Sequence, residues 1–166
     1  MSRIKVGMIT TLNTNIGDDL IRHGIQALLA YVLKNYEIEF SLVNKHHPMG
    51  VYPLWHPNRW VEFLPVGRKR LADLMGSLFS PFGFTRFEDS SLIVQCGAPV
   101  IWSGCNNCDW ALTLWHQVVG RLSSRVPVCN LAAGSAYPWE DQPNCVVDID
   151  DARYLDSIVS YCDLTT

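Results

Sequence analysis

Apolar and polar positions along this chain alternate between two repeating patterns. Short β-rich apolar runs predict strands, and apolar residues spaced three and four apart predict helices with one buried face. Strands are expected over residues 4–10, 37–43, 91–96 and 126–132, with a further one beginning at 163–166. Helices are expected from residue 18 to about 35 and over 67–79, 109–123 and 151–161. Alternating strands and helices predict an α/β fold, a Rossmann-like open parallel sheet with helices on both faces.

One segment, residues 45–66, does not follow either pattern. It holds four prolines with Tyr52, Trp55 and Trp60 between them. Proline removes a backbone donor, so this spacing excludes a continuous helix or an inner strand. Long loops in compact domains are uncommon and are often functional.

Composition restricts the class of protein. The 166 residues fit one domain, 48% of them are apolar and only 17% are charged. The net charge of −3 gives no general attraction to nucleic acid, and the basic run 68–70 fits a solvated helix face. The chain opens without a secretory signal and has no apolar run of membrane-spanning length. A cytoplasmic location is therefore expected, with the six cysteines as free thiols.

Ligands of open α/β sheets bind beyond the carboxyl ends of the strands, and three such ends carry small residues here. They are 13–19, 97–99 and 133–135. The first turn has neither the spacing of a dinucleotide fingerprint nor that of a P-loop. Asp18 and Asp19 would repel phosphate and suit a ligand with hydroxyl or amine donors. In the simpler interpretation, Asn15 or Asp18 only caps the helix.

Other side chains are weaker candidates. Cys105 and Cys108 have the spacing of a redox or zinc pair, but structural thiols are the simpler interpretation. The loop histidines His46, His47 and His56 lack the helical spacing of a metal site, so no metal is expected. The loop aromatics Tyr52, Trp55 and Trp60, and Trp102 and Trp110 after the third strand, either stack on a sugar face or pack internally. No catalytic triad can be assembled, and the catalytic residues stay unassigned.

Several short motifs together resemble the N-terminal half of the polysaccharide pyruvyl transferase family. They are the turn Asn15-x-Gly17-Asp18-x-Leu20 after the first strand, the strand end Leu92-Ile93-Val94-x-x-Gly97-x-Pro99 with Trp102 shortly after, the stretch Val126-Pro127-Val128 through Gly134, and the closing 160–166. The turn is moderately specific. The Gly-x-Pro element is weaker, since many members have two adjacent glycines where this chain has Cys96-Gly97.

The resemblance implies a glycosyltransferase-B-like fold of two Rossmann-type halves, of which residues 1–166 would be the first, single domain. It implies an enzyme of exopolysaccharide biosynthesis that transfers a pyruvyl group from phosphoenolpyruvate to a saccharide as a ketal. No cofactor is implied beyond that donor substrate. The groups that hold phosphoenolpyruvate in the family lie mainly in the C-terminal half, so this chain would supply the acceptor side and be inactive alone.

The residues expected to bind substrate are accordingly Asn15, Gly17, Asp18, Asp19, Gly97, Pro99, Trp102 and Gly134. The partners expected are a saccharide acceptor and a second half or partner subunit, with neither nucleic acid nor a membrane span. One alternative is a non-catalytic Rossmann-like module that binds a ligand or a partner. A weaker one is a thiol redox protein that uses Cys105 and Cys108.

Overall fold

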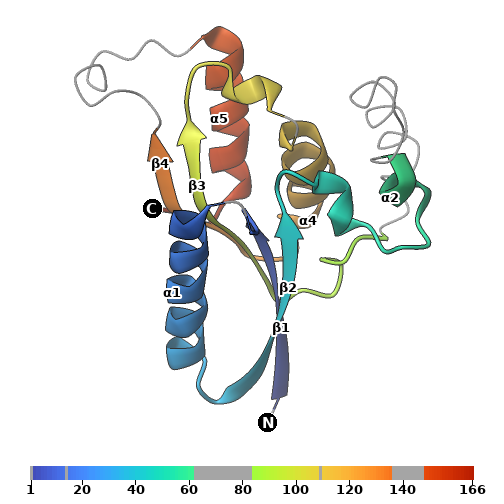
Figure 1. Ribbon diagram of the computed structural model, residues 1–166, viewed down its shortest axis with the longest axis vertical. Coiled ribbons are helices and arrows are strands. Elements are labelled where there is room, and N and C mark those ends of the chain that lie inside the picture. Colours follow the sequence, from blue (N-terminus) through green and yellow to red (C-terminus); the bar gives the residue numbers. More distant parts are fainter. Residues whose placement is uncertain (1, 14, 62–83, 109, 136–147) are drawn as a thin grey trace.

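The computed structural model describes residues 2–13, 15–61, 84–108, 110–135 and 148–166 (Figure 1). Its centre is a parallel five-stranded sheet in the order β2-β1-β3-β4-β5. The strands are β1 (Ser2–Thr10), β2 (Tyr36–Asn44), β3 (Leu92–Ile101), β4 (Val128–Ser135) and β5 (Leu164–Thr165). The predicted α/β fold with an open parallel sheet is confirmed, whereas the likeness to one half of a glycosyltransferase-B fold stays a prediction.

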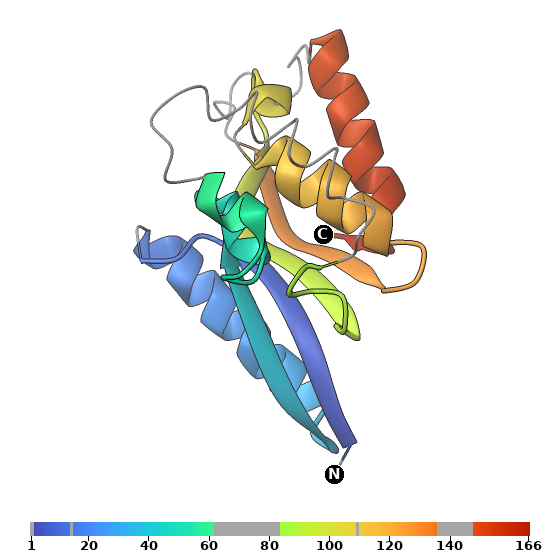
Figure 2. The ribbon, with the colours of Figure 1, turned by 90° about the vertical axis from the view of Figure 1, so that its right-hand side faces the viewer.

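Helices cover both faces of this sheet, and Figure 2 shows α1 on one side and α4 and α5 on the other. The helices are α1 (Ile16–Val32), η1 (Pro48–Val51), α2 (Pro57–Val61), η3 (Cys105–Asn107), η4 (Ala111–Val119), α4 (Gly120–Leu122) and α5 (Ile149–Tyr161). Of these, η1 and η3 are 3₁₀ turns and η4 is a π-helix.

The two faces have separate cores. Under α1, Ile25 packs with Val6 and Met8 of β1 and with Val94 and Cys96 of β3. The opposite core is larger and is built around the π-helix. Its fully buried members include Leu114, Trp115, Val118, Ile93 and Ile158. The apolar face predicted from the helical spacing in 109–123 is therefore confirmed as buried.

Two features differ from the sequence prediction for local reasons. The first helix ends at Val32 rather than near residue 35. The Leu33 N–H makes the last helical bond, to the Leu29 carbonyl (2.8 Å), but Leu33 itself leaves the helical conformation, and the Tyr36 N–H donates to the Leu33 carbonyl (2.9 Å) in the turn into β2. The proline-rich segment is not one loop but carries two short helices, each opening at a proline whose fixed φ suits a first turn. The helix predicted over 67–79 lies outside the described residues.

Within the described residues, no helix is both long enough and apolar enough to cross a bilayer.

Candidate functional site

The turn after β1 brings the first helix onto the carboxyl edge of the sheet. Asn15 has an extended backbone, and its side-chain oxygen accepts from the Gly17 N–H at 2.9 Å, so Asn15 is the N-cap of α1. Asp18 and Asp19 follow in the first helical turn, as predicted. Their charges lie at the positive end of the helix dipole, where carboxylates are stabilised and a phosphate would be repelled.

The two carboxylates have different surroundings because of Arg22. This arginine is buried one turn further along α1, and its Nη1 donates to the Thr11 carbonyl at 3.1 Å and to Asp19 Oδ1 at 2.5 Å. The ion pair fixes the turn to the helix and occupies Asp19. Asp18 is not part of this ion pair and, among the described residues, is the carboxylate of this turn that remains for another partner.

Gly97 of β3 lies directly against Asp18. A Cβ at position 97 would lie 3.1 Å from the Asp18 carbonyl oxygen, and the φ of Gly97 is +68°. Both the space and the backbone conformation therefore require glycine. This contact joins two segments that the sequence analysis proposed separately, about eighty residues apart along the chain.

A buried lysine lies at the same edge, immediately after β2. Lys45 is 5% exposed, and its backbone N–H donates to the Thr10 carbonyl at 2.9 Å. Its amine is 5.0 Å from the centre of the Trp110 ring. Burial lowers the pKa of Lys45, while the charges of Asp18 and Cys108 oppose that shift. Buried lysines with lowered pKa values are typical of functional sites.

Sequence reasoning missed Lys45. Its signal was available, since it directly follows a strand at the ligand-binding edge of the sheet. It was grouped instead with the proline-rich segment that begins there.

The cysteine pair lies in the turn after β3, which Asp151 of α5 holds by hydrogen bonds. The Asp151 carboxylate accepts from the N–H groups of Gly104 (2.7 Å) and Asn106 (3.0 Å) and from the Cys105 thiol (3.4 Å). Burial and this carboxylate raise the pKa of Cys105 to about 11, and burial also raises the pKa of Cys108. These thiols stay protonated at neutral pH, which favours a structural role. All five described cysteines are free.

The remaining predicted positions lie at the same edge, in two groups. Pro99 of β3 pairs in register with Gly134 of β4, next to the Gly97 contact. Trp102 is half-buried and packs near Trp110, with ring centres 5.9 Å apart. The structure thus places every predicted position near the carboxyl ends of β1, β3 and β4.

The aromatic and histidine candidates of the proline-rich segment separate by burial. Tyr52 is buried and stacks on His56, with ring centres 4.6 Å apart, so it packs internally. Trp55 and Trp60 are exposed. Burial lowers the pKa of His56, whose Nδ1 accepts from the Asn58 N–H at 3.2 Å. In the part of the chain that the structure describes, no group of three or more His, Cys, Asp or Glu residues is placed to hold a metal ion.

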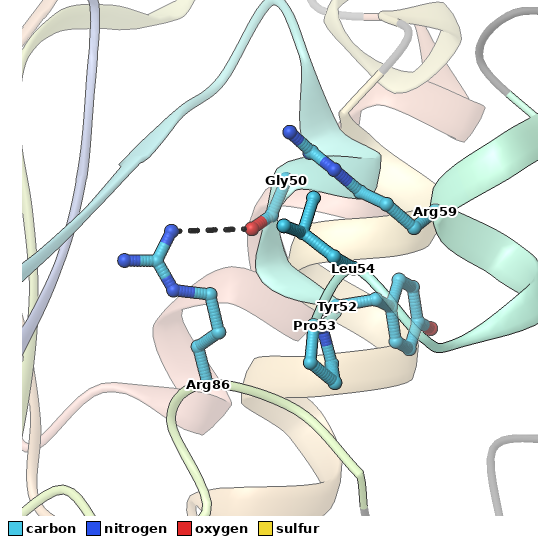
Figure 3. A pocket seen from close by; sticks show the side chains of 6 residues that line it. All are labelled: Gly50, Tyr52, Pro53, Leu54, Arg59 and Arg86. Carbon is cyan, nitrogen blue, oxygen red and sulfur yellow. Dashed lines mark hydrogen bonds between the residues drawn. The ribbon is translucent and has the colours of Figure 1, made fainter.

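A separate pocket of about 330 Å³ lies between η1, α2 and the segment before β3 (Figure 3). Its described lining combines apolar side chains with two guanidinium groups. It consists of Gly50, Tyr52, Pro53, Leu54, Arg59 and Arg86. Arg86 Nη1 donates weakly to the Gly50 carbonyl at 3.5 Å, and the Arg59 guanidinium lies so close to Gly50 that a Cβ there would be 2.9 Å from its Nη1.

No protein-family model, curated protein or solved structure matches the chain. The carboxyl edge offers a carboxylate acceptor at Asp18, a buried amine at Lys45 and closely approaching backbone at Gly97. That set suits a polar, hydroxyl-bearing ligand better than a nucleotide phosphate.

Proposed function

We propose that this chain is the acceptor-side domain of a pyruvyl-transferase-like enzyme. In the proposed reaction a pyruvyl group moves from phosphoenolpyruvate to a saccharide and forms a ketal. This chain positions the acceptor hydroxyls, and a second half or partner subunit holds the donor. The catalytic groups themselves are not assigned to residues of this chain.

The observation that supports the proposal is the contact of Asp18 with Gly97 at the carboxyl edge. It joins the Asn15-x-Gly17-Asp18 turn to the glycine-bearing strand end, which are two of the four motifs behind the family resemblance. The carboxylate accepts hydrogen bonds, as a saccharide hydroxyl requires. The Lys45 amine, at the same edge of the sheet, donates them, so the two groups together complement a ligand that carries hydroxyl groups.

A binding experiment on the chain itself tests the acceptor role. Saturation-transfer NMR with a panel of mono- and disaccharides is expected to show saccharide binding that Asp18→Asn weakens about tenfold, which corresponds to one lost charge-assisted hydrogen bond. Asp156→Asn, an exposed carboxylate on α5, is the matched control and should bind like the wild type. A panel with no binding sugar would contradict the acceptor role.

The transfer reaction requires the donor half. Labelled phosphoenolpyruvate mixed with the acceptor panel and the longer parent protein should give a pyruvylated product, whereas residues 1–166 alone should give none. Failure across a broad panel with the parent protein would count against the transferase.

The pocket in Figure 3 favours a second candidate, a non-catalytic module that binds a small anion. Two guanidinium groups beside an apolar floor suit a carboxylate- or phosphate-bearing molecule. Calorimetric titration with inorganic phosphate and with benzoate should show binding that Arg86→Gln abolishes. Arg153→Gln on the exposed face of α5 is the control. Equal heats for both variants would remove this candidate.

A further inference from the structure

Helix α1 is apolar around most of its circumference, although only one side of it touches the sheet. Asp18, Arg22 and Ile25 are buried against the strands. On the outer side the helix exposes large apolar residues along its whole length, a pattern typical of helices covered on both sides. They are Ile16, Leu20, Ile21, Leu28, Tyr31 and Val32, with exposed fractions between 39% and 79%. We call these six residues the outer stripe. No described element lies beyond it (Figures 1 and 2).

Gly24, at the middle of this helix, points to close contact with something outside the chain. A Cβ at Gly24 would meet nothing within 4 Å, so packing within the described part of the chain does not require glycine. A glycine inside a helix costs about 1 kcal/mol relative to alanine. Gly24 and the exposed Ala27 are small residues, so they leave a shallow depression in the outer stripe between Leu20 and the pair Leu28 and Tyr31. A depression of this kind lets a second helix approach closely.

The size and charge of the outer stripe indicate which kind of partner covers it. Its exposed side chains present on the order of 700 Å² of mostly apolar surface, close to the roughly 800 Å² that each partner buries in a standard interface. Between Asp19 and Lys34 the only formally charged side chain of α1 is Arg22, which is buried and bonded. A copy of the same surface therefore meets no like charge.

We propose that two copies of this chain associate through α1. The two helices pack antiparallel about a two-fold axis midway between Gly24 and Ala27, so that Leu20 of one copy lies beside Tyr31 of the other. An isologous contact of this kind closes at the dimer. The proposal does not depend on the proposed function, since the saccharide site lies at the carboxyl edge and the outer stripe runs along the side of α1 that faces away from the sheet.

Sedimentation equilibrium of the 166-residue chain tests this inference. A monomer–dimer equilibrium with a dissociation constant in the micromolar range is expected. Leu20→Glu and Tyr31→Lys should each raise that constant at least about thirtyfold. Val159→Glu is the matched control, because it adds a charge at an apolar position of α5 that is 60% exposed and lies off the outer stripe. Circular dichroism melts check that the variants fold.

Mixing tests the orientation. In an antiparallel pair the Leu20→Glu chain and the Tyr31→Lys chain place opposite charges beside each other, so their equimolar mixture should associate more tightly than either variant alone. A monomeric wild type at all concentrations, or a dimer that both variants leave intact, would overturn the inference. A mixture no tighter than its components would overturn the antiparallel arrangement.

Discussion

Asp151 offers a sharp test of how the carboxyl edge is held together. The side chain is 1% exposed and accepts from two backbone N–H groups and one thiol. Hydrogen bonds to a charged group contribute about 1.5–3 kcal/mol each, and part of that sum offsets the cost of burying the carboxylate. Asp151→Ala should therefore lower the free energy of unfolding by about 3–5 kcal/mol. Asp151→Asn, which keeps one acceptor oxygen, should lower it by about 2–3 kcal/mol.

The assay is urea unfolding at pH 7, monitored by tryptophan fluorescence. The matched control is Asp148→Ala, because Asp148 also accepts from a backbone N–H, that of Asp150 at 2.9 Å, but is exposed. As an ordinary helix N-cap it should contribute about 1 kcal/mol. Equal losses for Asp148→Ala and Asp151→Ala would refute the reasoning, because burial and the number of donors would then not matter.

The acid dependence provides a second check. Burial alone would raise the pKa of Asp151, but the N–H groups of Asn106 and Gly104 and the Cys105 thiol bring it below its ordinary value. A carboxylate with a lowered folded-state pKa stabilises the protein above its unfolded value of about 3.9, and this stabilisation is lost as the pH falls through the folded value. The gap between wild type and Asp151→Asn should be constant from pH 7 to 5 and shrink below pH 4. A gap that widens in acid would contradict the assigned hydrogen bonds.

Three further predictions use the same unfolding assay or a labelling assay. Gly97→Ala should lower the free energy of unfolding by about 2–4 kcal/mol, because the new side chain meets both strain at positive φ and the close contact with Asp18. Gly104→Ala, where φ is +83° but the space is open, should lower it by about 1–2 kcal/mol. Equal losses would show that the close contact with Asp18 contributes nothing. Lys45→Met should leave stability at pH 7 unchanged or higher. It should also abolish the rise in stability that the lowered pKa of Lys45 produces as the pH approaches 10.5, and a rise of equal size in the variant would contradict this. Iodoacetamide followed by mass spectrometry should label Cys105 and Cys108 slowly at pH 7, and fast labelling of either would revive the redox alternative.

The sheet was predictable because long stretches of its inner strands β1 and β3 are buried. Apolar runs such as that of β1 read directly as inner strands, and the helical spacing in α1 and α5 was equally clear. The π-helix was not foreseen, since an apolar face at three- and four-residue spacing does not distinguish a π turn from an α turn. The short helices at Pro48 and Pro57 were missed because proline was taken as a breaker rather than as a first residue.

The candidate site was only partly predictable, for a different reason. Strand ends can be located in a sequence, so the turn with Asp18 and the strand end with Gly97 could both be proposed. Which side chains meet there depends on long-range packing. Lys45 is buried beside Trp110, and Asp151 accepts a hydrogen bond from Cys105. Both contacts join segments tens of residues apart, so no local sequence pattern predicts them.

The order of the strands also sets the timing of folding during synthesis. The unit β1-α1-β2 is complete once residue 44 has left the ribosome, and its strands pair over their full length. The opposite core cannot close until Ile158 of α5 has emerged. Until η4 (Ala111–Val119) has emerged, the face opposite α1 lacks the helix around which its core is built, and a sheet covered on one face only is the kind of intermediate on which chaperones act.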